Sequence, residues 1–438
     1  MNKKNLIATW SLFISFMAVG LPGTVQAQSQ DRFSQVKVAV LYENITDGVS
    51  LGRSPAATIK LLQETRADMI FRGFWKWETV VESPDDIPDG LLEFTRQEGF
   101  SDKQASEKVR RSGHYYQALA SWIAAIKKEL PDIIFCGAIP AQHLFRVEVD
   151  PITGKVFTAE ETWAMALDPQ RWALTRNGKP VSKEQFQARI SGMKPGKNGA
   201  EAEYDRFKAT AYFPDITNPD FQKLLLSWAE KQIDCGADAI WIDMLYAQAK
   251  LISRATQDPN HPAVKESLAA AIKLIDRIHK YGESKGKYIY VGSWGQSISE
   301  FGAQADFGRL DFVTFAPSKE EIRNNGLDKE KWEGKISDVR SIHGNIPVFS
   351  FIDWSNNDSQ TVTFSQELDT QEQARVLKTF DASFSQLGVN FVYPLHGGYM
   401  GKVSTKVSFG QSRVYDSLAP EFQTYETIKE LARIKAEK

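Results

Sequence analysis

The apolar positions of the chain fall into eight short runs rich in Val, Ile, Phe and Tyr. Stretches with helical periodicity separate most of these runs. The runs lie at residues 36–42, 67–73, 133–137, 239–243, 288–292, 312–315, 347–352 and 390–393. Nearly continuous apolar runs of this length are typical of strands that are buried on both faces of a parallel sheet.

The segment before the fourth run carries the clearest helix signals. Asn218 is a good capping residue, and Pro219 suits the first position of a helix. Apolar side chains then recur with near-helical spacing until Gly236, a residue that commonly follows a helix end. The apolar run 239–243 comes directly afterwards and closes with an acid, Asp243.

The alternation of eight strands with helices predicts an α/β fold, a (β/α)₈ or TIM barrel, with an open doubly wound sheet as the alternative. The third strand and the capped helix are far apart, and the stretch at about 139–213 contains loop signals such as Gly154 and Pro169. We therefore predict a single barrel domain at residues 28–438, with a long insertion in the third βα loop.

The first residues resemble an export signal. Lys3 and Lys4 precede an apolar stretch at residues 6–21, and residues 25–27 give a small-x-small cleavage pattern. We expect residues 1–27 to be a cleavable signal peptide of a secreted or periplasmic protein, with no stable membrane span after cleavage. The alternative is an uncleaved anchor, because the apolar stretch approaches the length of a membrane span.

Composition narrows the possible partners and cofactors. The chain has 438 residues and a net charge of −2, with no cluster of Lys and Arg that would predict nucleic-acid binding. Cys136 and Cys235 each lie in an apolar context, which favours buried thiols over a disulfide. The six histidines lack ligand spacing, and the glycine-rich stretch 396–401 lacks G-x-G-x-x-G, so we expect neither metal nor cofactor. Oligomeric state is left open.

Candidate chemistry lies at the strand ends, because residues just past the carboxyl ends of barrel strands face one site. This criterion collects Tyr42, Glu43, Arg72, Phe74, Trp75, Trp77, Gln142, His143, Arg146, Asp243, Ser293, Trp294, Pro317, Ser318, Asp353, Trp354, His396 and Tyr399. The set mixes acids, aromatics, Arg and His, as a carbohydrate site does, and we expect a carbohydrate substrate.

A resemblance supports a role for Asp243. Residues 215–219 match D-x-x-N-P and residues 236–243 are similar to G-x-D-G-[FI]-x-x-D, the segments before and in strand four of several α-retaining glycoside hydrolases. The chain most resembles the barrels grouped with the endo-α-1,4-polygalactosaminidases and, more distantly, the α-amylase superfamily. The strand-four acid of those barrels is the catalytic nucleophile, so the resemblance implies that role for Asp243.

The sequence also departs from the amylase pattern. Trp241 stands where that pattern has an Arg, and Ser293 and Trp294 stand where it has a Glu at the end of strand five. Residues 352–354 replace its N-H-D triplet. The resemblance therefore assigns no general acid/base.

Glycoside hydrolysis needs a second carboxyl group. Asp353 is the first choice because it ends the seventh strand beside an aromatic residue, and Glu300 on the strand-five loop follows, with Asp215 next. A helix cap or a hydroxyl-binding role is the alternative for Asp353, as a cap is for Asp243.

The remaining candidates are expected to bind substrate. They are Arg72, Trp75, His143, Asp215, Trp294, Trp354, His396 and Tyr399. Each has a structural alternative, because an Arg in an apolar run can hold a carboxylate across the barrel and a single Trp is more often part of the core.

Two functions from different classes follow from this set. The first is a glycoside hydrolase acting on a polysaccharide or an extracellular glycan through a carboxylate pair centred on Asp243. The second is a carbohydrate-binding barrel without catalysis, which the missing strand-five acid favours. A metal-dependent deacetylase or amidohydrolase is a third, but it needs paired His or Asp ligands that the scattered histidines do not supply.

Overall fold

The computed structural model describes residues 32–176, 178–190, 209–295, 301, 305–353, 359–400 and 414–437. The expected signal peptide, Glu300 and Trp354 lie outside these residues. No helix in the described part is both long and apolar enough to cross a membrane. Cys136 and Cys235 are both free thiols; Cys136 is buried as predicted, whereas Cys235 is only half-buried.

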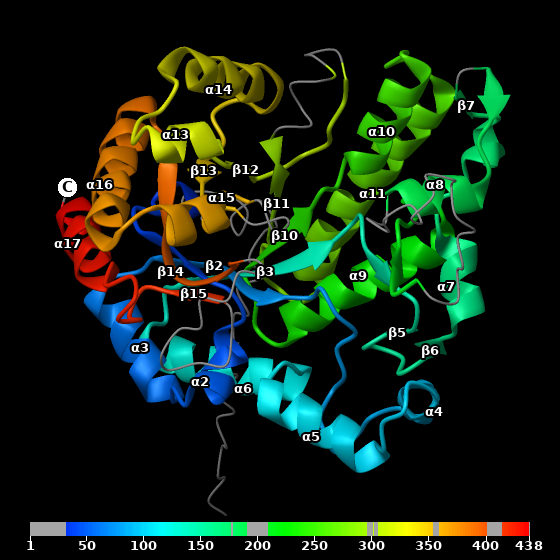
Figure 1. The fold of residues 1–438 in the computed structure, drawn as a ribbon, viewed down its shortest axis with the longest axis horizontal. Coiled ribbons are helices and arrows are strands. Elements are labelled where there is room, and N and C mark those ends of the chain that lie inside the picture. The colour runs from blue at the N-terminus through cyan, green and yellow to red at the C-terminus, as the bar shows by residue number, and fades with distance from the viewer. Residues whose placement is uncertain are drawn as a thin grey trace, which may run out of the picture.

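Eight parallel strands form a closed barrel at the centre of the molecule (Figure 1). They are β1 (Ala39–Tyr42), β2 (Met69–Trp75), β3 (Ile134–Pro140), β10 (Ala239–Asp243), β11 (Tyr290–Trp294), β12 (Phe312–Phe315), β13 (Val348–Ser350) and β14 (Asn390–Tyr399). Each strand pairs in parallel with the next in this order, and β14 pairs with β1. This closure confirms the predicted (β/α)₈ barrel and excludes the open sheet, and all eight apolar runs fall on these strands. The short strand β15 (Val414–Asp416) adds to β14 in antiparallel orientation.

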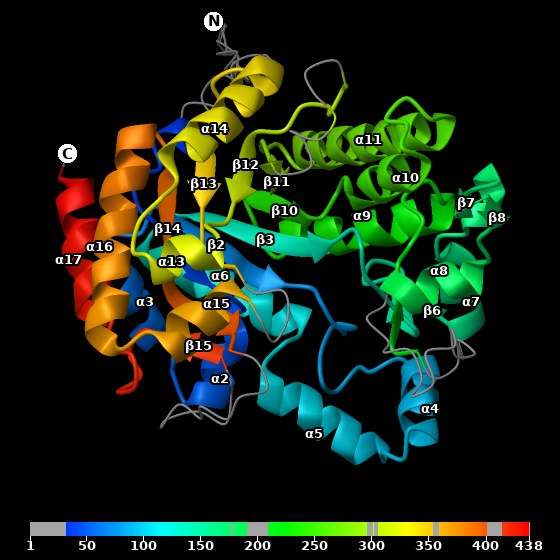
Figure 2. The same ribbon diagram turned by 45° about the horizontal axis from the view of Figure 1, so that its top comes forward.

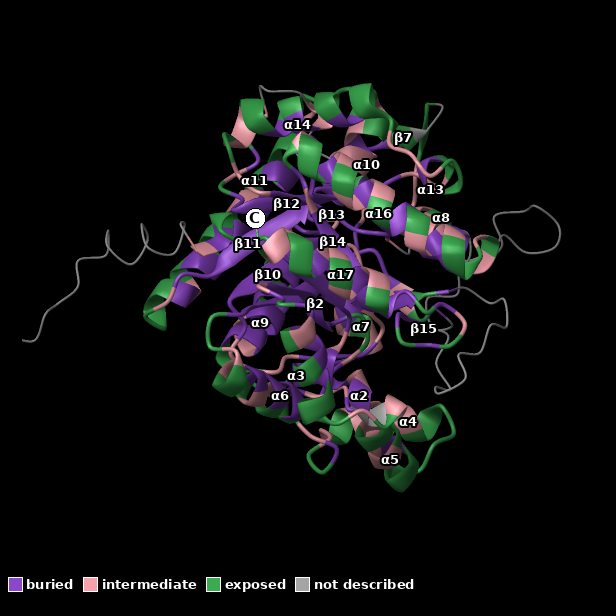
Figure 3. Cartoon of the chain, turned by 90° about the vertical axis from the view of Figure 1, so that its left-hand side faces the viewer, coloured by how far each residue is buried: buried purple, intermediate pink, exposed green. Residues whose placement is uncertain are grey.

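Helices follow the strands and cover the outside of the barrel (Figures 1 and 3). The covering helices are α3 (Pro55–Glu64), α6 (Tyr116–Glu129), α9 (Pro219–Asp234), α11 (Pro262–Ser284), α14 (Lys329–His343), α16 (Thr370–Leu387) and α17 (Tyr425–Ala436). Shorter helices in the connections are α2 (Gly48–Leu51), α10 (Ala247–Thr256), α13 (Lys319–Arg323) and α15 (Gln360–Val362). The Asn218 side chain caps α9 by accepting from two backbone N–H groups, as predicted.

The barrel core has two faces because side chains alternate along each strand. In β10, Ala239 and Trp241 point into the barrel, while Ile240 and Ile242 pack against the helices. Phe33 closes the amino end of the barrel, with its ring centroid 4.3 Å from that of Tyr290. The interior is therefore a packed aromatic core, and the opposite, carboxyl end is left for chemistry.

The predicted third-loop insertion falls between β3 and α9. Its described part contains three short antiparallel strand pairs, β4 (Leu144–Phe145) with β9 (Ala211–Tyr212), β5 (Glu148–Val149) with β6 (Val156–Phe157), and β7 (Thr175–Arg176) with β8 (Lys179–Pro180). It also contains α7 (Ala159–Met165) and α8 (Lys183–Ile190). The loop-like interpretation of this stretch was therefore wrong in part, because a capping box between Thr158 and Glu161 starts a helix there.

A second elaboration follows β2 and was not predicted. The helices α4 (Asp89–Gln97) and α5 (Asp102–Ser112) lie between β2 and α6 and extend from the barrel on the side of the insertion (Figure 2). Few of their side chains are buried, since α4 buries none and α5 buries only Ala105. Their weak contribution to the core explains why the apolar pattern gave no signal for this pair.

Candidate active site

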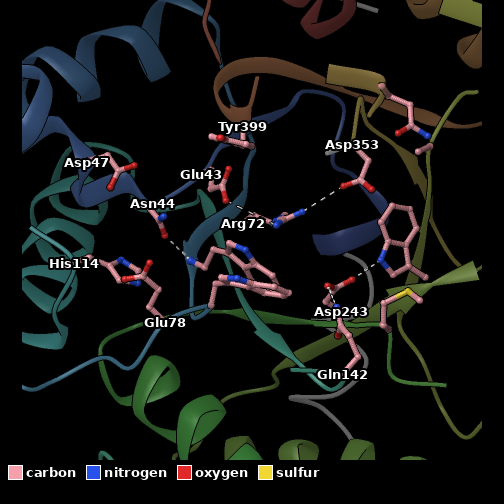
Figure 4. A pocket seen from close by; sticks show the side chains of 16 residues that line it. Glu43, Asn44, Asp47, Arg72, Glu78, His114, Gln142, Asp243, Asp353 and Tyr399 are labelled. Atoms are coloured by element: carbon pink, nitrogen blue, oxygen red, sulfur yellow. Dashed lines mark hydrogen bonds and ion pairs between the residues drawn. The ribbon is translucent and has the colours of Figure 1, made fainter. Parts of the chain in front are cut away.

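A cavity of about 850 Å³ opens at the carboxyl end of the barrel (Figure 4). Its described lining includes a residue at or just after the end of each of the eight strands, as a (β/α)₈ barrel predicts. The lining residues are Glu43, Asn44, Asp47, Arg72, Trp75, Trp77, Glu78, His114, Gln142, Asp243, Met244, Trp294, Ala316, Asp353, Gln360 and Tyr399.

Asp243 is the last residue of β10, and the residue as a whole is 9% exposed. Its Oδ1 accepts a hydrogen bond of 2.6 Å from the indole N–H of Trp294, and its Oδ2 accepts one of 2.5 Å from the Gln142 amide. Tyr246 stands at the cap position of α10, so Asp243 does not cap the next helix. Burial raises the pKa of Asp243, whereas Arg72 and the two donors oppose this rise. The strand end thus presents a positioned carboxylate.

Arg72 occupies an irregular point in β2. Its φ of 55° is left-handed, and the pairing of β2 with β3 shifts register between Ile70 and Phe74. This irregularity directs the side chain into the barrel mouth, where the guanidinium carbon lies 4.4 Å from the Trp75 ring centroid and 5.0 Å from that of Trp241. Trp241 stands where the amylase pattern has an Arg. In this structure the positive charge comes from Arg72, whose guanidinium lies over the Trp241 ring.

The Arg72 guanidinium lies between two further carboxyl groups. Its Nη1 is 3.7 Å from Asp353 Oδ1, and its Nη2 is 3.9 Å from Glu43 Oε1 (Figure 4). Asp353 follows β13 and reaches the same cavity as Asp243, so the structure brings the first two carboxyl candidates together. The third candidate, Glu300, lies outside the described residues.

Glu43 lines the cavity; the strand-end criterion collected it, but the sequence prediction gave it no catalytic or binding role. It follows β1, and its Oε2 accepts a 2.9 Å hydrogen bond from the Gly398 amide. Gly397 allows this approach, because a Cβ there would lie 2.4 Å from the Glu43 Cβ. Burial raises the pKa of Glu43, and Arg72 opposes the rise. Its place after β1 was the signal that collected it, but the sequence prediction gave the second carboxyl role to Asp353, Glu300 and Asp215 instead.

Aromatic rings form one wall of the cavity. Trp75 and Trp77 are stacked with centroids 5.3 Å apart, and the His143 ring stacks on Trp77 at 3.9 Å. Trp75 is 7% exposed because Arg72 and Trp77 cover its ring, whereas Trp77 is 36% exposed. His143 is absent from the described lining, and burial lowers its pKa to about 3, so it supports the Trp77 ring as a neutral side chain.

His396 lies behind the cavity wall. Its Nδ1 is 2.8 Å from Asp416 Oδ2, and its Nε2 is 3.8 Å from Oδ2 of the cavity-lining Asp47. Arg53 completes this buried group at 2.9 Å from Asp416. Burial alone would lower the pKa of His396, but the hydrogen bond to Asp416 and the nearby Asp47 carboxyl group outweigh it and raise the pKa to about 10. His396 therefore reaches the cavity through Asp47.

Asp215 lies outside the cavity lining, near the start of α9. Its Oδ1 accepts from Gln248 at 2.9 Å and from Thr217, and its Oδ2 pairs with Arg171 at 3.0 Å. The structure thus places this carboxyl in the network that anchors the loop before α9. Tyr399, at the end of β14, is 38% exposed and does line the cavity, as expected.

Three lining residues other than glycine have left-handed backbone: Asn44, Arg72 and Met244, with φ of 54–55°. Such conformations cost roughly 1–3 kcal/mol each and cluster at functional sites. Asn44 also holds the β2 irregularity, because its Oδ1 accepts from the Trp75 backbone N–H at 2.7 Å. Within the described residues no group of three or more His, Cys, Asp or Glu side chains could hold a metal ion.

Comparisons with known proteins concern the fold. No family model and no curated protein matches the sequence. The α-amylase from H. orenii is similar in structure, with a TM-score of 0.49 and 12% identity over 92% of this chain and 82% of that chain. A debranching enzyme from Nostoc punctiforme gives 0.44 and 11% over 89% and 71%. The glycoside hydrolase domain of PelA from Pseudomonas aeruginosa gives 0.33 and 10% over 63% and 83%. With TM-scores below 0.5 these likenesses carry no argument, and the barrel rests on the strand order of the chain itself.

Proposed function

We propose that the protein is a glycoside hydrolase that cleaves glycosidic bonds of a polysaccharide or an extracellular glycan. The observation that carries the proposal is the Asp243 carboxylate, which is nearly buried at the barrel mouth with both oxygens accepting side-chain hydrogen bonds. A buried carboxylate is costly to keep unless it is paired or used, and perturbed acids in a cleft are typical of catalytic sites.

The proposed chemistry uses Asp243 with a second carboxyl group. Asp243 would attack or stabilise the anomeric carbon, because donors on both oxygens favour the ionised form. In a retaining reaction the bond to the leaving oxygen breaks as Asp243 bonds to the anomeric carbon and Asp353 protonates that oxygen; Asp353 then takes a proton from the water that displaces Asp243 from the sugar. In an inverting reaction water attacks the anomeric carbon directly, with one carboxyl group as base and the other as acid. A separation of about 5–5.5 Å between the two carboxyl groups corresponds to retention, and about 6.5–9.5 Å to inversion.

The remainder of the cavity supports a sugar ligand. Carboxylate, amide and phenol groups suit hydroxyl groups, and the exposed Trp77 ring offers apolar surface for sugar C–H groups. We also propose that the signal expected at residues 1–27 directs export, so that the protein meets its glycan outside the cytoplasm.

A carbohydrate-binding barrel without catalysis is the second candidate. It is favoured by one observation, the end of β11, which contributes Trp294 to the cavity in place of an acid.

The experiment is reducing-sugar release by the mature protein on a panel of polysaccharides, with Asp243→Asn and Asp353→Asn alongside. We expect wild-type release and a loss of roughly a thousandfold or more in Asp243→Asn, the scale of losing a central catalytic group. The anomeric configuration of the first product, followed by ¹H NMR, distinguishes retention from inversion.

The matched control is Asp338→Asn, an exposed acid on α14, which should keep wild-type activity. Absence of release from every glycan, with equal glycan binding by wild type and Asp243→Asn, would reject the hydrolase and support the binding barrel.

A further inference from the structure

Acidic side chains outnumber basic ones in the described lining of the cavity. Its described lining holds five acids, listed as Glu43, Asp47, Glu78, Asp243 and Asp353, and one cation, Arg72. The lining also includes His114, whose pKa is lowered to about 4 by burial, so it adds no positive charge at neutral pH. Several carboxylates this close to one another would repel and take up protons unless a cation offset them.

The Arg72 side chain lies between carboxyl groups of the cavity, where its positive charge offsets their negative charge. It is 4% exposed, and its guanidinium packs on the rings of Trp75 and Trp241 while contacting Glu43 and Asp353 on its two sides. The left-handed backbone and the register shift in β2 place it there.

The irregularity itself is secured by Asn44. The Asn44 backbone N–H donates to the Arg72 carbonyl at 3.3 Å, and its side chain accepts from the Trp75 amide. A strained backbone that is fixed on both sides by hydrogen bonds indicates that the direction of the Arg72 side chain matters.

We propose that Arg72 is a positioning residue whose guanidinium offsets the charge of the cavity carboxylates and orients Glu43 and Asp353. Its catalytic consequence rests on the proposed glycoside hydrolase function, since Asp243 must be ionised to act as nucleophile. Its electrostatic consequence holds in the ligand-free protein.

The physical basis is the competition between burial and charge. Burial is the largest influence on Asp243 and on Glu43 and raises both pKa values, and the Arg72 charge is the next largest and lowers both. Among the described residues, the other charged or titratable groups of the lining are Asp47, Glu78, His114 and Tyr399, and His396 lies behind Asp47. Removing Arg72 should therefore leave Asp243 protonated over a wider pH range.

The experiment compares Arg72→Met and Arg72→Lys with wild type. Aspartate labelled with ¹³C at the side-chain carboxyl group reports the titration of Asp243 by NMR in the ligand-free protein, with Asp243→Asn and Asp353→Asn to assign the signals. We expect the Asp243 midpoint to rise by about one to three pH units in Arg72→Met, the usual effect of an adjacent Arg. The lysine variant, which keeps the charge, should lie closer to wild type.

The second readout is the pH dependence of kcat and KM on whichever glycan the wild type cleaves. The acidic limb for Arg72→Met should shift upward with the NMR midpoint, and kcat should change more than KM. Arg375→Met, an exposed arginine on α16, is the matched control and should leave both readouts unchanged. Arg72→Gln repeats the measurement if the methionine variant does not fold.

An unchanged Asp243 midpoint in a folded neutral variant would overturn the proposal and leave Arg72 a packing role only. A shifted midpoint in a protein that cleaves no glycan would support the electrostatic role and reject the proposed hydrolase. The two failures are therefore distinguishable.

Discussion

Single residues at the barrel mouth combine burial with directed hydrogen bonds. Asp243 is the clearest case, because two side chains from neighbouring strands, Gln142 after β3 and Trp294 in β11, each serve one of its oxygens. Hydrogen bonds to a charged group are worth about 1.5–3 kcal/mol, more than those between neutral groups. These donors should therefore influence both the orientation and the ionisation of the carboxylate.

Trp294→Phe tests this contribution. It removes the N–H donor and keeps most of the ring, which packs 5.2 Å from the Phe351 centroid. If the proposed hydrolase is correct, we expect kcat to fall about ten- to a hundredfold, the equivalent of one charged hydrogen bond. The acidic limb of the pH profile should also move to higher pH, because the Trp294 donor lowers the pKa of Asp243 and its loss raises that pKa. Steady-state kinetics across pH measures both.

Trp332→Phe is the matched control. Trp332 donates to Glu321 at 2.8 Å in the core, away from the cavity. It should lower the free energy of unfolding without changing kcat per folded molecule. Equal kcat values for Trp294→Phe and wild type would contradict the role of the Trp294 donor.

At the scale of elements, the seam where β14 meets β1 carries a buried ionic network. His396 belongs to β14, Asp416 to β15, and Asp47 to the short 3₁₀ helix after β1. Arg53 precedes α3 and contacts both Asp416 and the Tyr42 hydroxyl. The network thus ties the last strands to the first and places a cavity acid, Asp47, at its edge.

The network predicts a pH-dependent stability. The pKa of His396 is raised from 6.5 to about 10, so its stabilising contribution is fully present below about 6.5 and is lost as pH rises toward 10. We expect His396→Gln to be less stable than wild type at pH 6, with the difference shrinking progressively up to pH 10. Urea unfolding of both proteins over this range measures it.

A stability difference that stays constant from pH 6 to pH 10 would contradict a protonated His396.

At the scale of the whole molecule, a buried ion pair joins the barrel to the third-loop insertion. Lys76, just after β2, lies 2.6 Å from Glu148 in β5, and its Nζ is 3.5 Å from the Trp228 ring centroid in α9. Both side chains are almost fully buried. Burial lowers the pKa of Lys76 and raises that of Glu148, while each partner opposes the shift of the other.

Removing one partner should be costly. We expect Lys76→Met or Glu148→Leu alone to reduce the free energy of unfolding by about 3–5 kcal/mol, because an unpaired charge stays buried. The double variant should be more stable than either single one, since apolar side chains then replace the whole pair. Denaturant unfolding of the four proteins gives the coupling.

The exposed pair of Arg110 with Asp85 serves as the control, and Arg110→Met should change stability little. Additive single effects for Lys76 and Glu148 would contradict a coupled pair.

Local sequence patterns were sufficient for the scaffold. Apolar runs placed all eight strands, and Asn218 with Pro219 placed the start of α9, because these features depend on neighbours in the chain. Barrel geometry then brings strand ends to one face, which is why Asp243 and Asp353 were predicted at the site and line the same cavity.

Which side chains meet at the strand ends could be learned only from the tertiary structure. The sequence prediction named His143, and not Gln142, as a substrate-binding residue. In the structure the Gln142 side chain donates to Asp243, whereas His143 stacks on Trp77. Likewise, the composition of β1 and β2 gives no sign that Glu43, which follows β1, meets Arg72 in β2. The contact between Glu43 and Arg72 depends on the register shift between β2 and β3, on the left-handed backbone of Arg72 and on the close approach of Gly397 to Glu43. Each of these features involves chain segments that are far apart in the sequence. The sequence by itself therefore determined the barrel and the acids at its strand ends. The tertiary structure decided which side chains donate hydrogen bonds to these acids and that the Arg72 guanidinium lies between Glu43 and Asp353.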